Sequence, residues 1–359
     1  MKEVHNVGLV GYGMASKTFH APLIAATPGL EIAAVSSSDP DKVHADLPGV
    51  EVVASPQALF ARHDVDLVVI PTPNETHYPL AKAALAAGKH VIVDKPFTVT
   101  LSEGRLLKGH AEEAGKLLSV FHNRRWDSDF LTVRALLEAR TLGRLTHFES
   151  HFDRFRPEIN DRWREKPKPG SGLWYDLGPH LLDQAREAFG MPRAILLNLA
   201  KRRDGARVDD DFHALLDYDG LRVVLGASAL VAADSPRFVL HGTQGSYVKH
   251  GLDPQEGWLK EGRTPTPRWG VDSRDGDLVL REGDSEAAEL ATHACGTLPG
   301  DYLAYYTAIR DALAGKGNNP VPVDDALAVM QLLETGLDSA RQERWVKLKE
   351  GGSGLRRKY

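Results

Sequence analysis

Short apolar runs rich in β-branched residues alternate with helical patterns over the first third of the chain, from Val4 to about Phe121. Such runs predict strands, and the helices between them let each strand return parallel to the last through a right-handed crossover. The sequence therefore predicts an α/β fold that begins with a doubly wound, Rossmann-type domain. Its strands are expected at Val4–Val10, Glu31–Ser36, Val50–Val53, Asp66–Ile70, His90–Val93 and Leu117–Phe121.

The expected helices of this domain begin and end at recognisable residues. Ser55-Pro56 opens one, because serine caps a helix and proline fits its first position. Thr76 is expected to cap a second that runs to Gly88, and Thr100 or Ser102 to start a third that ends at Gly115.

The pattern changes after about residue 122. A helix over Ser128–Ala139 is followed by many strands without regular helices between them, which predicts a largely antiparallel, open sheet and an α+β domain. One open face would favour a homodimer or a higher homo-oligomer. These strands are expected at Leu145–Arg154, Ala194–Arg202, Asp211–Tyr218, Leu221–Leu230, Phe238–His241, Ser246–His250 and Leu278–Arg281.

Length and composition set the limits of this organisation. A chain of 359 residues exceeds the size at which one core usually keeps growing, so we expect domains at 1–122 and 123–348, with a flexible tail at 349–359. A net charge of −5 offers no basic field for nucleic acid. The longest apolar runs are far shorter than a bilayer span, and the N-terminus lacks a secretory pattern, so a cytoplasmic protein that binds no membrane is expected. The single Cys295 offers no disulfide or thiolate metal cluster.

A glycine-rich turn follows the first strand. Gly11 and Gly13, with Tyr12 and Met14, stand where that strand passes into a helix. Absence of Cβ lets a pyrophosphate approach the backbone at a helix N-terminus, so the turn predicts a dinucleotide site. Ser16 stands where the G-x-G-x-x-G pattern has its third glycine, and its small side chain is expected to be tolerated.

The end of the second strand bears on the choice between NAD and NADP. A carboxylate there usually holds the ribose 2′-hydroxyl of NAD. Here the chain has the run Ser36-Ser37-Ser38 followed by Lys42, which suits the 2′-phosphate of NADP, so NAD(P) is expected with NADP favoured. The alternatives are that Asp39 serves as the acid, or that the serines only start the next turn.

Two further segments follow strands at the same sheet edge, where ligands of this fold bind. After the fourth strand, candidates for lining the dinucleotide are Thr72, Pro73, Asn74 and His77. After the fifth come Asp94, Lys95 and Pro96, and a lysine there can contact a ribose hydroxyl or stabilise a substrate oxygen. A Lys-Pro bond can also be cis at modest cost.

A long connection from Arg156 to Phe189 contains Asp176 and His180. We expect Pro179 in the first turn of a helix, which would place His180 in that turn and Asp176 just before it. The helix dipole would then favour a neutral imidazole that accepts a proton, with Asp176 orienting it or a substrate hydroxyl. The D-x-x-x-H spacing also suits a pair of metal ligands, but no third ligand is evident and no metal is expected.

As a set, these motifs resemble the glucose–fructose oxidoreductase and inositol dehydrogenase family, Gfo/Idh/MocA. The similarity covers about Val4 to Leu348 and rests on Gly8…Gly11-x-Gly13, Asp94-Lys95-Pro96 and Gly170-Ser171-Gly172…Asp176-x-Gly178-x-His180. The family pattern has Glu-Lys-Pro, so Asp94 is one methylene shorter than the usual acid. The resemblance implies a Rossmann domain, a C-terminal α/β domain whose open sheet often dimerises, and a site of Lys95, Asp176 and His180.

The motifs and the resemblance together predict an NAD(P)-dependent oxidoreductase acting on a secondary alcohol or ketone of a sugar, polyol or related small molecule. His180 would take the hydroxyl proton, Lys95 would stabilise the oxygen, and Asp176 would fix the hydroxyl. Asn123, Arg124 and Trp163 fall in regions that shape the family's substrate pocket. Arg124, Arg156, Arg162 and Arg164 leave room for a carboxylate or phosphate on the substrate. The alternatives are a nucleotide-binding regulator on this scaffold and a hydrolase or lyase that uses tightly bound NAD transiently.

Overall fold

The computed structural model describes residues 4–160, 163–266, 269–283 and 289–348. The chain folds into two compact units, each assembled from several stretches of sequence. The first unit comprises Met1–Trp126, Pro254–Trp269 and Asp301–Met330, and the second comprises Asp127–Asp253, Gly270–Gly300 and Gln331–Tyr359. The sequence predicts a single boundary after residue 122. In the structure, Pro254–Trp269 and Asp301–Met330 also belong to the first unit. The expected tail at 349–359 lies outside the described residues.

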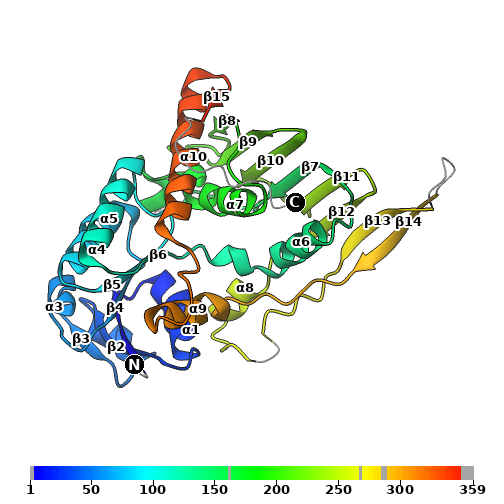
Figure 1. Cartoon of the computed structure of the whole chain (residues 1–359). Coiled ribbons are helices and arrows are strands. Elements are labelled where there is room, and N and C mark those ends of the chain that lie inside the picture. Colours follow the sequence, from blue (N-terminus) through cyan, green and yellow to red (C-terminus); the bar gives the residue numbers. More distant parts are fainter. Residues whose placement is uncertain (1–3, 161–162, 267–268, 284–288, 349–359) are drawn as a thin grey trace. The chain divides into compact units, whose positions relative to one another are not determined.

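The described strands of the first unit form a six-stranded parallel sheet with the order β3-β2-β1-β4-β5-β6 (Figure 1). This order confirms the Rossmann-type prediction. Its central strands β4 and β5 are almost entirely buried, because helices cover both faces of such a sheet. The strands are β1 (His5–Val10), β2 (Leu30–Ser36), β3 (Glu51–Val53), β4 (Leu67–Ile70), β5 (His90–Val93) and β6 (Leu118–Val120).

The three helices expected in the first unit begin at the residues that the sequence indicated, although Thr76 makes no side-chain cap on α4. Ser55 caps α3 by accepting a hydrogen bond from the amide of Ala58. Thr100 and Glu103 form a capping box at the start of α5, which ends at Gly115 in the left-handed conformation. The helices are α1 (Ala21–Ala25), α2 (Pro40–His44), α3 (Pro56–Phe60), α4 (His77–Ala86), α5 (Leu101–Ala114), α8 (Gln255–Lys260) and α9 (Leu303–Leu313).

The second unit contains a sheet in which the described strands have the order β14-β13-β12-β11-β7-β10-β9-β8-β15. Its pairs are antiparallel except for β7 and β10, which confirms the largely antiparallel sheet. The sequence missed β14 and β15. The strands are β7 (Leu145–His151), β8 (Ala194–Ala200), β9 (Asp211–Tyr218), β10 (Leu221–Ser228), β11 (Pro236–Gly242), β12 (Gly245–His250), β13 (Gly276–Glu282), β14 (Glu289–Cys295) and β15 (Val346–Lys347).

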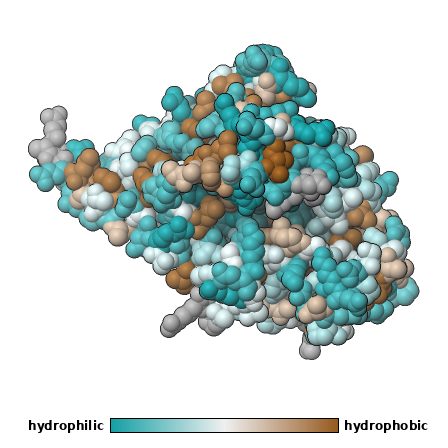
Figure 2. Space-filling model, turned by 180° about the vertical axis from the view of Figure 1, so that it is seen from behind, coloured by the Kyte–Doolittle hydropathy of each residue, from teal (hydrophilic) through white to brown (hydrophobic). Residues whose placement is uncertain are grey.

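One face of this sheet packs against α7 (Leu173–Phe189), whose Trp174 is fully buried beside Phe212. The other helices of the second unit are α6 (Ser128–Glu138) and the end of α10 (Val323–Gln342), which begins in the first unit. At the sheet edge β13 and β14 form a projecting arm (Figure 1), and Figure 2 shows a small hydrophobic patch near its end. No helix in the described ranges is long and apolar enough to span a membrane.

Candidate active site

The glycine turn at the end of β1 is held by a left-handed glycine and two hydrogen bonds. Gly11 has a φ of +82°, which strongly favours glycine, and its amide donates to the carbonyl of Ser36 over 2.8 Å. Ser16, at the place of the third glycine, donates its hydroxyl to the carbonyl of Gly11 over 2.8 Å. The departure from the glycine pattern therefore closes the turn with a hydrogen bond, and Ser16 is fully buried.

This turn lies where the sheet order reverses, between β1 and β4. Ligands of open α/β sheets bind at such a switch point, outside the carboxyl ends of the strands. A Cβ at Gly13 would meet nothing within 4 Å, so space is open beside the backbone. Tyr12 is buried, and this burial, together with the Asp46 carboxylate, raises its pKa to about 12, while Met14 is exposed. The turn therefore fits a pyrophosphate approached through backbone amides.

The end of β2 presents hydroxyl groups beside this turn. Ser36 is buried, Ser37 is half-buried, and Ser38 and Lys42 are exposed. Asp39 caps α2: its Oδ1 accepts the amide of Lys42 over 3.0 Å, and its own amide donates to Ser37 Oγ over 3.1 Å. One oxygen of the Asp39 carboxylate is thus engaged in holding the helix start. The arrangement leaves the Ser38 hydroxyl and the Lys42 ammonium on the surface at the strand end.

The turn after β4 is held by its own side chains. Thr72 and Thr76 share a hydrogen bond of 2.6 Å between their hydroxyls, while Pro73 is exposed and Asn74 is buried. His77 is fully buried, with its ring nitrogens 2.8 Å from the Thr72 carbonyl and 2.9 Å from the Pro96 carbonyl. His77 therefore joins this turn to the Lys95 segment. Both ring nitrogens of this buried side chain are occupied by these contacts, and its expected place in the dinucleotide lining stays a prediction.

Lys95 stands directly beyond β5, on the same edge of the sheet. The Asp94 amide donates to the Ile70 carbonyl over 3.1 Å, which ties this turn to β4. Asp94 Oδ1 accepts the backbone amide of Lys95 over 2.7 Å, and the Lys95–Pro96 peptide bond is cis. Lys95 is half-buried. The first unit thus gathers the glycine turn, the Thr72 turn and Lys95 at neighbouring strand ends.

In the second unit, Asp176 and His180 lie four residues apart on α7, which places them on one face of that helix. The expected helix start was wrong. The helix begins at Leu173, so Asp176 belongs to its first turn, Pro179 lies inside it, and His180 is beyond the reach of the N-terminal dipole. His180 is 6% exposed, and Asp176 is half-buried.

The cause of this early start is a cap from a distant residue. Asp209 Oδ2 accepts the Trp174 amide over 2.7 Å, and the Asp209 carbonyl accepts the Leu173 amide over 2.8 Å. A Cβ at Gly172 would lie 2.0 Å from Asp209 Oδ1, so glycine is required for this close approach. The sequence prediction missed Asp209, because no local pattern links it to α7.

The loop before α7 adds charge next to the Asp176 carboxylate. Arg164 Nε lies 3.6 Å from Asp176 Oδ1. The backbone of Trp163–Glu165 forms a short 3-10 turn, but the Trp163 side chain and Arg162 lie outside the described residues. A guanidinium beside Asp176 on a partly exposed loop is suited to contact an anionic or hydroxyl-rich substrate.

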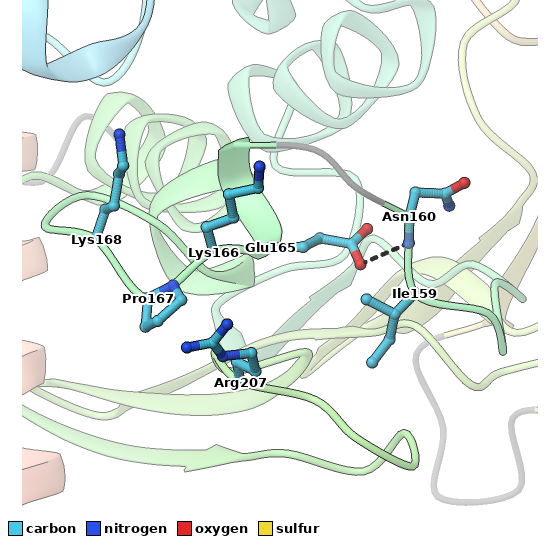
Figure 3. A pocket seen from close by; sticks show the side chains of 7 residues that line it. All are labelled: Ile159, Asn160, Glu165, Lys166, Pro167, Lys168 and Arg207. Atoms are coloured by element: carbon cyan, nitrogen blue, oxygen red, sulfur yellow. Dashed lines mark hydrogen bonds between the residues drawn. The ribbon is translucent and has the colours of Figure 1, made fainter.

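The same loop borders an open hollow of about 680 Å³ in the second unit (Figure 3). Asp176 and His180 do not belong to its described lining. The Glu165 carboxylate accepts the Asn160 amide over 3.1 Å, while the three cationic side chains give the hollow a net positive charge. Its lining residues are Ile159, Asn160, Glu165, Lys166, Pro167, Lys168 and Arg207.

Two substrate candidates in the first unit are buried. Asn123 and Arg124 are each 5% exposed, and Arg124 forms a short ion pair with Glu256 of α8. The neighbouring Arg125 pairs with Asp325 over 3.0 Å. Arg124 therefore links α8 to the end of the Rossmann sheet, and its expected contact with substrate stays a prediction. No group of three metal-ligating side chains occurs in the part of the chain that the structure describes.

Models of one protein family match both parts of the chain. The model of an oxidoreductase family's NAD-binding Rossmann fold matches residues 5–122, and the model of the same family's C-terminal alpha/beta domain matches residues 134–348. The chain belongs to the Gfo/Idh/MocA oxidoreductase family. Membership makes it an enzyme of the oxidoreductase class with an NAD(P)-binding domain, as the motifs indicated.

Three known proteins are similar to nearly the whole chain. The uncharacterized oxidoreductase YdgJ of Escherichia coli is 58% identical, with 95% of this chain and 98% of that protein covered. The scyllo-inositol 2-dehydrogenase (NADP(+)) IolW of Bacillus subtilis is 36% identical, with 95% of each covered. The solved structure of YPO2259 from Yersinia pestis has a TM-score of 0.93 at 55% identity, with 98% of this chain and 99% of that chain covered.

Proposed function

We propose that this oxidoreductase transfers a hydride between NADP and a secondary alcohol or ketone of an inositol-like polyol. The observation that carries the proposal is its similarity, over 95% of its length, to an NADP-dependent scyllo-inositol 2-dehydrogenase. The presence of Lys95, Asp176 and His180 supports it, because alcohol oxidation needs a proton acceptor and a group that stabilises the developing charge on oxygen.

Each residue of the proposed site has a separate role in the reaction. Bound NADP supplies the acceptor for the hydride. The His180 imidazole takes the hydroxyl proton of the alcohol and returns it when the ketone is reduced. The Lys95 ammonium donates a hydrogen bond to the same oxygen, and the Asp176 carboxylate accepts one from a substrate hydroxyl. The Arg164 guanidinium places a compensating positive charge beside the Asp176 carboxylate.

A polyol assay tests the substrate class. Incubation with NADP⁺ and scyllo-inositol is expected to produce NADPH, followed by its absorbance, and myo-inositol serves as the matched epimer. Turnover of either would support the inositol class. Turnover only of acidic or phosphorylated alcohols would contradict that class. It would favour binding of an anionic substrate at the basic hollow of Lys166, Lys168 and Arg207.

The choice of cofactor gives a second prediction. The Lys42→Ala variant is expected to weaken NADPH binding by about tenfold and to leave NADH binding unchanged, since it removes one charge-assisted contact with a 2′-phosphate. Fluorescence titration of both nucleotides measures this, and His44→Ala, an exposed residue of the same helix, is the control. Equal weakening of both nucleotides, or tighter binding of NADH by the native protein, would contradict it and favour Asp39 as the ribose ligand.

We also propose a homodimer or larger assembly formed through the open face of the second unit's sheet. The register aligns a row of half-buried aliphatic side chains across neighbouring strands, on the face opposite the buried core. The row also contains Glu149, which contacts His147 and His151. The aliphatic members are Leu196, Leu215, Val224, Val239 and Val248.

Light scattering tests this assembly. The native protein is expected to have at least twice the chain mass of 39.3 kDa. The Val239→Lys variant is expected to dissociate, because it places a charge in the apolar row, whereas Thr292→Lys, at an exposed position of the β14 edge, serves as its control. A monomeric native protein would overturn the proposal.

A further inference from the structure

His20 is a buried histidine that the proposed reaction does not use. It ends a π-helical turn over Ser16–His20, which follows the glycine turn, and its side chain is fully buried. Its ring centroid lies 4.5 Å from that of Phe121, among aromatic side chains. Single turns of π-helix are frequent at functional sites. A polar imidazole buried at this position needs polar partners.

Each ring nitrogen of His20 faces a polar group of the first unit. Nδ1 lies within hydrogen-bond distance of Tyr306 Oη at 2.6 Å, whereas Nε2 lies 3.9 Å from Asp94 Oδ2, an electrostatic contact beyond hydrogen-bond distance. The negative charge of the Asp94 carboxylate favours the imidazole proton on Nε2, the nitrogen that faces it. The Tyr306 hydroxyl then donates to Nδ1.

The ionisation of the two partners agrees with this assignment. Burial raises the pKa of Tyr306 well above its usual value, so the phenol keeps its proton and can donate it. Burial also acts to raise the pKa of Asp94, but His20 and the Lys95 ammonium outweigh it and hold this pKa below its usual range. Asp94 is therefore a carboxylate facing an N–H group.

The chain of contacts continues from Asp94 to the lysine. Asp94 Oδ2 faces His20, while its Oδ1 accepts the backbone amide of Lys95 over 2.7 Å. We propose that His20, held by Tyr306 as the Nε2–H tautomer, is a positioning residue that fixes the Asp94 carboxylate and thereby the placement of Lys95. His20 thus links the helix that follows the glycine turn to the lysine segment. The consequence for turnover rests on the proposed function, whereas the tautomer and the contacts do not.

Two adjacent tyrosines of α9 provide a matched pair of variants. Tyr305 and Tyr306 are both fully buried, and each loses one hydroxyl on substitution by phenylalanine. Tyr305 Oη donates to Ser119 Oγ over 2.9 Å, whereas Tyr306 Oη contacts His20. Tyr305→Phe therefore controls for the loss of a buried hydroxyl, and thermal unfolding of both variants shows that each is folded.

The tautomer is measured without any substrate. In the full-length protein labelled with ¹⁵N-histidine, the signals of His20 are assigned by their loss in His20→Gln. We expect a protonated Nε2 and an Nδ1 that accepts a hydrogen bond, a state kept in Tyr305→Phe and lost in Tyr306→Phe. A native His20 protonated only on Nδ1, or the same spectrum in both tyrosine variants, would overturn the proposal.

A double-mutant cycle measures the consequence for turnover with NADP⁺ and scyllo-inositol. Tyr306→Phe is expected to lower kcat by about tenfold, since displacement of a catalytic group by about 1 Å can cost about a hundredfold. Tyr305→Phe should stay within about twofold of the native kcat, and Tyr306→Phe should cost no more than about twofold when added to Asp94→Asn. NADPH affinity should be unchanged in both tyrosine variants.

Equal losses of kcat in the two tyrosine variants would contradict the proposal, as would a full loss from Tyr306→Phe in the Asp94→Asn background. Absence of turnover by the native protein would instead count against the proposed polyol substrate. In that case the ¹⁵N spectra alone decide the role of His20.

Discussion

The Lys95→Ala variant is expected to lower kcat by about two orders of magnitude or more while its affinity for NADPH stays nearly unchanged. The ammonium acts on the oxygen that gains negative charge as its proton passes to His180, so its contribution is greatest in the transition state. The backbone amide that anchors Lys95 to Asp94 is retained in the variant. Loss of kcat with retained binding is therefore the signature of the proposed role.

Steady-state kinetics and NADPH fluorescence titration on the same preparations test this prediction. Lys82→Ala, at an exposed position on α4 of the same unit, is the matched control and should behave as the native protein. A Lys95→Ala variant with native kcat would remove the lysine from the mechanism. A variant that loses NADPH binding in proportion to kcat would instead make Lys95 a cofactor ligand.

The His180→Asn variant is expected to lose about two orders of magnitude in kcat, because an amide cannot accept and release the proton of the alcohol. Asparagine is smaller than histidine but keeps a polar hydrogen-bond donor at this buried position of α7. His180 lies inside the helix and not in its first turn, so the proposed proton transfer cannot depend on the helix dipole.

The effect must be separated from damage to the buried helix. His213→Asn, at an exposed position of β9 in the same unit, is the control, and thermal unfolding of both variants checks their stability. Native kcat in a folded His180→Asn would rule out a proton-transfer role for His180. An equal loss of kcat in His213→Asn would show that the effect is not specific to the proposed acid–base residue.

The Rossmann unit followed from the sequence because its signals are local. Strands such as His90–Val93 are short continuous apolar runs, and helix ends such as Thr100 and Gly115 are marked by capping residues nearby in the chain. The glycine turn, with Ser16 in place of a third glycine, also has the predicted form.

The sequence failed where the deciding contact comes from a distant residue. The proline pattern predicts a first helical turn at Pro179, because proline is common there, but Asp209 caps α7 at Leu173 and the helix continues through the proline. The contact between His20 and Tyr306 could not be predicted either, because the two residues are far apart in the sequence. Strand β14 was missed because it is an exposed edge with little apolar patterning.

The motifs predict which residues lie at the strand ends of the candidate site, but they do not predict which residues those side chains contact. Lys95 and the glycine turn lie at the strand ends where the motifs placed them. His77 and Arg124, in contrast, are buried in links between elements, because their partners Pro96 and Glu256 are defined only in the folded chain.

Transfer of deuterium tests the central claim most directly. The protein is incubated with NADP⁺ and scyllo-inositol deuterated on carbon, and the nucleotide is analysed by mass spectrometry. Direct hydride transfer predicts one deuterium in each NADPH formed, together with one ketone product. A product formed without net reduction of NADP⁺, or NADPH without deuterium, would contradict hydride transfer to an exchangeable cofactor and favour a lyase or hydrolase that uses its nucleotide transiently.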